Sequence, residues 1–152
     1  MKLCDALNAD RVVLDLAADD KVGALQELLS RAASALGLVD TGPLLQRVLN
    51  REAICSTAVN RGVAIPHARS AEIDGVVASL GLHRRGLDFG SPDGQPVHLI
   101  FLVLSSEIAT PAYLSVLGRT ARIFHREDMR LQILAAESPQ DIIQAIADQE
   151  PA

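Results

Sequence analysis

One segment of the 152-residue chain, residues 62–69, combines a stiff backbone with a side chain that could do chemistry. It reads Gly-Val-Ala-Ile-Pro-His-Ala-Arg, so His67 directly follows Pro66. The proline ring fixes its own φ and favours extended geometry for Ile65. The backbone that carries the His67 imidazole is therefore conformationally restricted. A histidine held in this way can keep one ring nitrogen in a hydrogen bond and present the other as a nucleophile. The residue pattern alone still leaves open a plain solvated histidine at this position.

The other three histidines are weaker candidates. His83 stands beside two arginines at the expected end of a strand and is predicted to lie on the surface. His98 opens an apolar run, where a hydrogen-bonded structural role is expected. His125 falls at the end of a predicted helix, where a cation suits the helix dipole. His67 is therefore the candidate nucleophile.

Side chains that could hold an anion lie near His67 in the sequence. Arg51 offers a planar fork that matches phosphate oxygens, although most such surface charges are simply solvated. Ser56 and Thr57 add hydroxyl groups and are candidate phosphate contacts. A phosphoryl group on His67 would need partners of this kind, because its charge must be balanced. Whether these side chains meet depends on the fold.

Composition argues against several other functions. A net charge of −5 and an aromatic content of 3% give neither the basic stripe nor the stacking platforms of a nucleic-acid binder. Cys4 and Cys55 lie far apart without metal-ligand spacing, so we expect two free thiols, no metal and no cofactor. The start lacks a signal-peptide core, and no apolar run approaches the ~20 residues of a membrane span. We therefore expect a cytoplasmic protein that neither inserts into a membrane nor binds nucleic acid.

Hydrophobic periodicity predicts the elements that must position His67. Extended segments are expected at 11–16, 56–59, 63–65, 76–82 and 97–104. Helices are expected at 21–36, 44–52, 111–125 and 128–135, and in a last segment capped by Ser138. The run 97–104 is apolar on both faces, which is typical of a strand buried on both sides. This order predicts one domain, residues 1–148, in which helices sandwich a sheet, followed by a flexible tail at 149–152.

Residues 49–57 and 62–68 resemble the signature of the IIA proteins in the fructose/mannitol and nitrogen-regulatory branch of the bacterial phosphotransferase system. The G-x-A-x-P-H core is a specific motif of that family, and residues 87–97 and the final helices agree with it. The resemblance covers essentially the whole chain, a type-2 IIA domain. It implies an α/β fold with a mixed parallel and antiparallel sheet flanked by helices on both faces. It also implies that His67 accepts a phosphoryl group from an HPr-like carrier and that the family's active-site arginine falls on Arg51.

A phosphoryl carrier is thus expected, rather than a free-standing enzyme for small molecules. In the sugar branch the acceptor is a IIB domain, and in the nitrogen branch the phosphorylation state controls binding to regulatory target proteins. The chain carries no fused IIB or membrane domain, which favours the nitrogen-regulatory type. Two alternatives stay open: a regulatory binding module that no longer transfers phosphate, and a sugar-specific IIA that donates to a separate IIB.

Three positions depart from the family's pattern. The family commonly has a second histidine, followed by leucine, where this chain has Tyr113. A tyrosine can donate a hydrogen bond to a phosphoryl oxygen but is no cation near pH 7, which leaves the balance of onward transfer open. Cys55 stands where glycine is usual, and a small buried thiol is expected there in preference to a redox group. Asn60 replaces a glycine of a turn and is expected to adopt the left-handed backbone.

Overall fold

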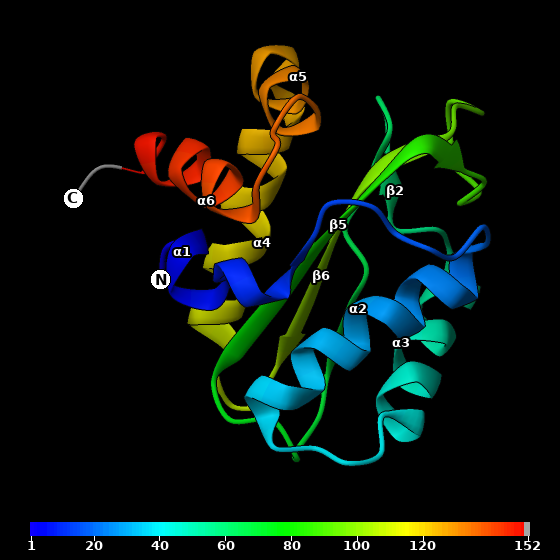
Figure 1. Cartoon of the computed structure of the whole chain (residues 1–152). Coiled ribbons are helices and arrows are strands. Elements are labelled where there is room, and N and C mark those ends of the chain that lie inside the picture. Colours follow the sequence, from blue (N-terminus) through cyan, green and yellow to red (C-terminus); the bar gives the residue numbers. More distant parts are fainter. Residues whose placement is uncertain (151–152) are drawn as a thin grey trace.

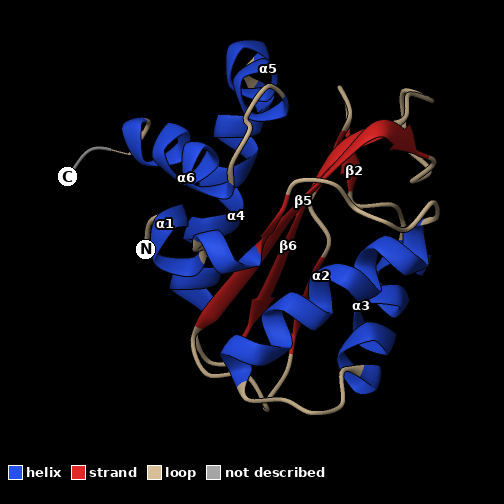
Figure 2. Ribbon diagram, viewed as in Figure 1, coloured by secondary structure: helices blue, strands red, loops and turns tan. Residues whose placement is uncertain are grey.

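A computed structural model describes residues 1–150 of the chain. A twisted sheet runs through the middle of the molecule, with α2 and α3 on one face and α1, α4, α5 and α6 on the other (Figures 1 and 2). The helices are α1 (Leu3–Ala6), the short 3-10 helix η1 (Ala9–Arg11), α2 (Lys21–Leu36), α3 (Gly42–Ile54), α4 (Thr110–His125), α5 (Glu127–Leu134) and α6 (Pro139–Asp148). The strands are β1 (Val12–Val13), β2 (Ala58–Val59), β3 (Val63–Ala64), β4 (His67–Arg69), β5 (Val76–Leu87) and β6 (Val97–Ser105). The predicted α/β class, with helices on both faces of the sheet, is confirmed.

The sheet is mixed, and β6 is the strand that organises it. β5 and β6 form its antiparallel centre, where Leu80 lies opposite Phe101. β1 pairs in parallel with β5, and the strand order is β1-β5-β6-β3-β2. β3 and then β4 run parallel to β6 along its other edge, while β2 is antiparallel to β3. His67 thereby pairs with Val103, near the end of β6.

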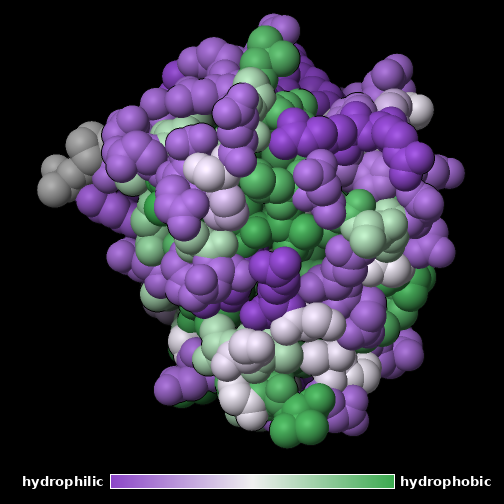
Figure 3. Space-filling view, viewed as in Figure 1, coloured by the Kyte–Doolittle hydropathy of each residue, from purple (hydrophilic) through white to green (hydrophobic). Residues whose placement is uncertain are grey.

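Alternate residues of β6 supply two separate hydrophobic cores. Phe101 and Val103 pack in the core beneath α1, α4, α5 and α6. Ile100 and Leu102 face the opposite way, into the core beneath α2 and α3. The predicted burial of this strand on both faces is confirmed, and it explains why the run is apolar without interruption. In the view of Figure 3, hydrophobic residues gather in the middle of the face, between the two helical layers.

Local capping signals set several helix ends where the sequence predicts them. Asp20 caps α2 by accepting a hydrogen bond from the backbone N–H of Gly23 at 2.7 Å, and Gly37 ends that helix at φ 68°. Ser138 caps α6 by accepting a bond from the N–H of Asp141 at 3.1 Å. Helix α3 runs two residues beyond its predicted end, so Arg51 lies in its last turn.

The turn between β2 and β3 differs from the expectation in one respect. The left-handed residues are Arg61, at φ 73°, and Gly62, at φ 81°; the expectation that Asn60 takes this conformation is wrong. The conformation is fixed by partners distant in sequence. The N–H of Arg61 donates to the Asp93 carboxylate at 2.9 Å, and Gly62 O accepts from the N–H of His98 at 2.8 Å.

Two other expectations are corrected. His83 is not a surface residue: β5 continues to Leu87, and His83 is only 5% exposed, with Nε2 3.7 Å from Asp19 Oδ1. Glu150 is not part of a frayed tail, because its carboxylate accepts a hydrogen bond from the N–H of Leu3 at 2.9 Å. Both corrections come from tertiary contacts that no local pattern encodes. Gln149, also in the expected tail, caps the end of α6, and residues 151–152 lie outside the described residues.

Candidate functional site

The ring of His67 is held by one hydrogen bond to the backbone. Its Nδ1 lies 2.8 Å from the carbonyl oxygen of Ile65. A carbonyl oxygen can only accept, so Nδ1 carries the hydrogen and Nε2 carries the free lone pair. The side chain is half-buried, which leaves it accessible from one side. The geometry therefore selects Nε2 as the nucleophilic atom.

The chain places His67 there by switching from one short strand to the next. β3 ends at Ala64, and β4 begins at His67, with Pro66 between them. Although Pro66 has no N–H, its carbonyl accepts a hydrogen bond from the N–H of Val103 at 2.9 Å, which ties the step to β6. The imidazole thus stands on backbone that is paired with the central strand of the sheet.

A basic depression of about 400 Å³ lies beside His67. Its lining includes His67 and Tyr113, together with three arginines and an asparagine from α3 and β4: Arg47, Asn50, Arg51 and Arg69. None of the ion pairs found among residues 1–150 involves these arginines. Arg51 donates from Nη1 to the carbonyl of Cys55 at 2.9 Å, which anchors it at the end of α3. The fold thus brings Arg51 and His67 to one depression, in surroundings suited to an anion.

The predicted hydroxyl groups line an adjoining, more apolar depression of about 260 Å³, together with Arg51 and His67. Ser56 Oγ donates to the carbonyl of Phe89 at 2.6 Å. The hydroxyl of Thr57 donates to the Glu52 carboxylate. Both residues reach the site, but their hydroxyl hydrogens are already engaged within the fold.

A buried carboxylate next to Arg51 escaped the sequence analysis. The Glu52 side chain is 3% exposed and accepts from Lys21 Nζ at 2.6 Å and from the N–H of Thr57 at 3.1 Å. The Lys21 ammonium in turn lies 4.5 Å from the centre of the Phe89 ring. Glu52 therefore joins α2 and α3 to the segment that carries Thr57. In the sequence it reads as an ordinary helical glutamate, and no local signal separates it from a solvated one.

Tyr113 lies between His67 and a second cation. Its ring meets the His67 ring edge-on, with centroids 6.1 Å apart, and the guanidinium carbon of Arg69 lies 5.0 Å from its centroid. Burial raises the pKa of the Tyr113 phenol, against the lowering effect of Arg69 and Arg51. The phenol is thus a neutral donor near pH 7. Arg69 was not singled out in the sequence, although it stands only two residues after His67.

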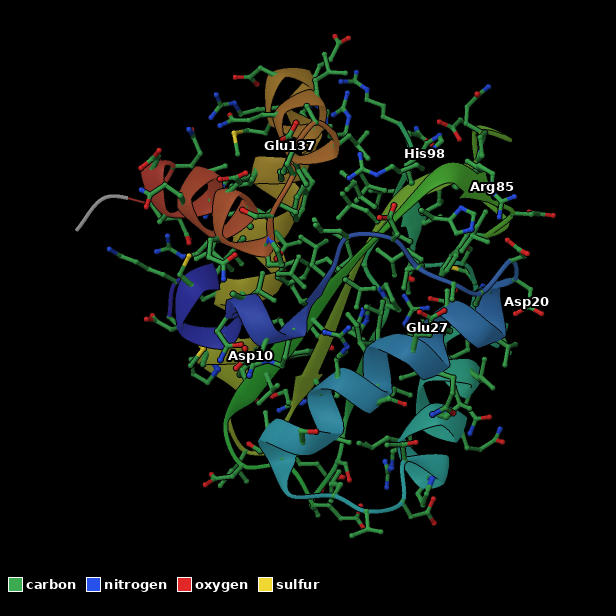
Figure 4. All side chains as sticks on the ribbon, viewed as in Figure 1. Asp10, Asp20, Glu27, Arg85, His98 and Glu137 are labelled. Atoms are coloured by element: carbon green, nitrogen blue, oxygen red, sulfur yellow. The ribbon has the colours of Figure 1, made fainter. Side chains whose placement is uncertain are left out.

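The remaining candidates from the sequence line neither of these two depressions. His98, which is labelled in Figure 4, has its Nδ1 3.0 Å from the carbonyl oxygen of His83, as expected for a structural histidine. His125 is the last residue of α4, as predicted. Cys4 and Cys55 are both free thiols, and Cys55 is exposed rather than buried. Within residues 1–150 no cluster of three or more histidine, cysteine, aspartate or glutamate side chains could hold a metal ion, and no helix is long and apolar enough to span a membrane.

Two relatives cover nearly the whole chain. The "Nitrogen regulatory protein" of Bradyrhizobium diazoefficiens is 33% identical over 147 residues, which are 97% of this chain and 95% of that protein. The "PTS system fructose-specific EIIABC component" of Bacillus subtilis is 34% identical over 146 residues, which are 96% of this chain but only 23% of that longer protein.

Solved structures share the fold. Nitrogen regulatory protein IIA-Ntr from Neisseria meningitidis superposes with a TM-score of 0.89 at 28% identity, covering 95% of this chain and 99% of that one. Enzyme IIAMtl of Escherichia coli, solved in complex with phosphorylated IIBMtl, gives a TM-score of 0.77 at 17% identity, covering 93% and 97%. Residues 5–149 match the family model described as "Phosphoenolpyruvate-dependent sugar phosphotransferase system, EIIA 2". The chain, which brings a backbone-held histidine and its arginines together at the edge of β6, therefore belongs to the EIIA type-2 family of that phosphotransferase system.

Proposed function

We propose that this protein is a phosphohistidine carrier that accepts a phosphoryl group on His67 Nε2 from an HPr-like phosphocarrier. The observation that carries the proposal is the hydrogen bond between His67 Nδ1 and Ile65 O, which leaves Nε2 as the nucleophile beside Arg51. In the transfer, Nε2 forms a new P–N bond while the P–N bond in the donor breaks and its electron pair returns to the donor nitrogen. The hydrogen on Nδ1 stays in its bond to Ile65 throughout.

Arg51 is proposed to balance the charge of the phosphoryl group. Among residues 1–150 only its Nη1 is tied to a backbone carbonyl, so further N–H groups of the fork are available for phosphoryl oxygens. Ser56 and Thr57 are proposed to shape the pocket around the phosphoryl group. A direct hydroxyl hydrogen bond from either residue would require it to leave Phe89 or Glu52 first.

The nitrogen-regulatory type is the downstream role that we favour, in which the phosphorylation state controls binding to target proteins. Its support is the full-length similarity to the Bradyrhizobium protein and the close superposition on the Neisseria structure. The second candidate is a sugar-branch IIA that passes phosphate to a separate IIB, which the Bacillus relative and the IIAMtl–IIBMtl complex favour. A module that binds targets without transferring phosphate is the third.

Intact-mass measurement after incubation with the general phosphotransferase enzyme, an HPr-type carrier and phosphoenolpyruvate tests the acceptor role. One acid-labile phosphoryl group is expected on the wild type and none on His67→Ala. His125→Gln is the control and should be labelled like the wild type, because His125 is an exposed residue at the end of α4. Equal labelling of His67→Ala and the wild type, or no labelling of the wild type, contradicts the proposal.

Two further measurements separate the downstream roles. A chase from the labelled protein to sugar-specific IIB proteins moves phosphate only if the protein is a sugar-branch IIA. A pull-down with phosphorylated protein, unphosphorylated protein and His67→Ala distinguishes the others. Binding that changes with phosphorylation supports the regulatory carrier, whereas binding that is identical in all three supports the module without transfer.

A further inference from the structure

Arg69 shares the exposed side of strand β4 with His67. Side chains two residues apart in a strand point to the same face, and Ala68 between them is buried on the other face. His67 and Arg69 both line the basic depression. The strand thus presents an imidazole and a guanidinium side by side, about 7 Å apart along the backbone.

Within the described part of the chain, the partners that hold the Arg69 guanidinium are all neutral. Nε donates to the carbonyl of Ser106 at 3.3 Å, and Nη2 donates to the carbonyl of Glu107 and to Thr110 Oγ1, each at 2.7 Å. The Tyr113 ring lies under the guanidinium, at 5.0 Å. These contacts hold the cation in place without cancelling its charge, because each partner is a carbonyl, a hydroxyl or a ring.

The free part of the fork is suited to an anion. Three of the five N–H groups of an arginine are accounted for by these bonds, and none of the hydrogen bonds found within residues 1–150 uses Nη1 of Arg69. The two N–H groups of Nη1 therefore remain available. Within residues 1–150 the Arg69 guanidinium also has no carboxylate partner. Tyr113 touches both neighbours, edge-on to His67 and beneath Arg69, and so keeps the two groups in a fixed relation.

We propose that Arg69 is a second phosphoryl-binding guanidinium, acting with Arg51 on the group carried by His67. The inference rests on the proposed carrier function and extends it to a residue that the sequence analysis did not assign. Both cations are guanidinium groups, which offer N–H donors as well as positive charge to phosphoryl oxygens. The uncharged ring of Tyr113 packs against the Arg69 guanidinium and helps to orient it.

Phosphorus NMR of the phosphorylated protein tests this assignment directly. The protein is loaded through the phosphoenolpyruvate cascade or with phosphoramidate, which donates its phosphoryl group to His67 Nε2 and releases ammonia. A nearby cation favours the dianionic phosphoryl group, so Arg69→Gln is expected to raise its second pKa by at least about half a unit. The same variant is expected to lower the equilibrium constant for transfer from the HPr-type donor about fivefold to tenfold.

Arg85→Gln is the matched control. Arg85 lies near the end of β5 that is farther from His67 (Figure 4), and among the described residues it is paired only with Asp19. It removes the same charge and is expected to leave both values unchanged. If Arg69→Gln matches the wild type in phosphoryl pKa and transfer constant, while only its thermal midpoint falls, Arg69 is merely structural and the inference is overturned.

Arg69→Lys keeps the positive charge and most of the aliphatic side chain. It is the variant to use if Arg69→Gln does not fold. A transfer constant about threefold below wild type, at a near-wild-type melting temperature, supports the inference. A wild-type transfer constant overturns it. Failure to label the wild-type protein at all would instead contradict the proposed function, so the two failures are distinguishable.

Discussion

The tautomer of His67 depends on a carbonyl that the sheet leaves free. Ile65 lies between β3 and β4, so its oxygen is not needed by the ladder and accepts from the imidazole at 2.8 Å. The N–H of the same residue donates to Thr57 O at 3.1 Å, which holds the carbonyl in place from the other side. Ile65, at the step from β3 to β4, therefore determines which nitrogen of His67 is the nucleophile.

At the same scale, Tyr113→Phe tests whether the phenol donates to the phosphoryl group. No hydrogen bond within residues 1–150 uses this hydroxyl, so its loss is expected to change the thermal midpoint of the unphosphorylated protein little. The phosphorylated form loses one donor to a charged oxygen, which lowers the equilibrium constant for transfer severalfold, about 1 kcal/mol. Because burial raises the pKa of Tyr113, the phenol stays protonated, and the difference between the two proteins should be constant above the second pKa of the phosphoryl group, up to about pH 9. A difference that vanishes at every pH would argue against the phenol as a donor.

At the scale of elements, the β2–β3 turn shows how distant partners choose between neighbouring residues. Arg61 is held at φ 73°, a conformation that is unfavourable for a residue with a Cβ by about 1–2 kcal/mol, while Asn60 is not left-handed. The bond from the Arg61 N–H to Asp93 at 2.9 Å survives in any side-chain variant.

Arg61→Gly is accordingly expected to raise the free energy of unfolding by about 0.5–1 kcal/mol, because relief of strain exceeds the added entropy of the unfolded glycine. Asn60→Gly at the adjoining position serves as the matched control and should lower stability or leave it unchanged. Urea unfolding of the two variants beside the wild type decides the matter. Stabilisation by Asn60→Gly alone would show that the strain lies elsewhere.

The pair formed by Glu52 and Lys21 connects three elements behind the site, namely α2, α3 and the segment after α3. Removing one member of a buried pair leaves the other without its partner, which is more harmful than removing both. Glu52→Gln is expected to lower the free energy of unfolding by about 1–3 kcal/mol. The loss should lie at the lower end of this range if the Lys21 ammonium, whose side chain is 25% exposed, can be hydrated once its partner is gone.

A double-mutant cycle measures this coupling. Lys21→Met, Glu52→Gln and the double variant are compared by urea unfolding, and the double variant should lose less stability than the sum of the single ones. Strictly additive losses would mean that the two side chains stabilise the fold independently.

At the scale of the whole molecule, the two ends of the described chain meet in one layer. The helices α1, α4 and α6 lie on the same face of the sheet, with α1 beside α6 (Figure 1). Glu150 links α1 to α4. Its side chain is 3% exposed, its carboxylate accepts a hydrogen bond from the N–H of Leu3, and it forms an ion pair with Arg119 at 3.3 Å. This layer carries Tyr113 on α4, so its integrity bears on the site.

Glu150→Ala is expected to destabilise the protein by about 1–3 kcal/mol, because it leaves a buried backbone N–H without an acceptor. Glu137→Ala removes an exposed glutamate in the loop between α5 and α6 and should have little effect (Figure 4). Thermal unfolding of both variants provides the measurement. Equal midpoints would show that the carboxylate of Glu150 is dispensable.

The sequence by itself determined the features that depend on neighbours along the chain. The end of strand β3 before Pro66, the capped ends of α2 and α6, and the doubly buried strand β6 all rest on local geometry or periodicity, and each is found as predicted. The motif that contains His67, together with Arg51, was also sufficient to predict the family. Periodicity is enough here because helices and buried strands repeat the same environment every few residues.

Tertiary structure alone decided which other groups meet at the site and which side chains are buried. Arg69 is ordered by Ser106, Glu107 and Thr110, all more than thirty residues away, and Tyr113 reaches His67 only because α4 packs on the sheet. The burial of His83, the anchoring of Glu150 and the left-handed backbone of Arg61 have the same origin. Such contacts form when distant segments are brought together by burial of the two cores, and no short stretch of sequence contains both partners.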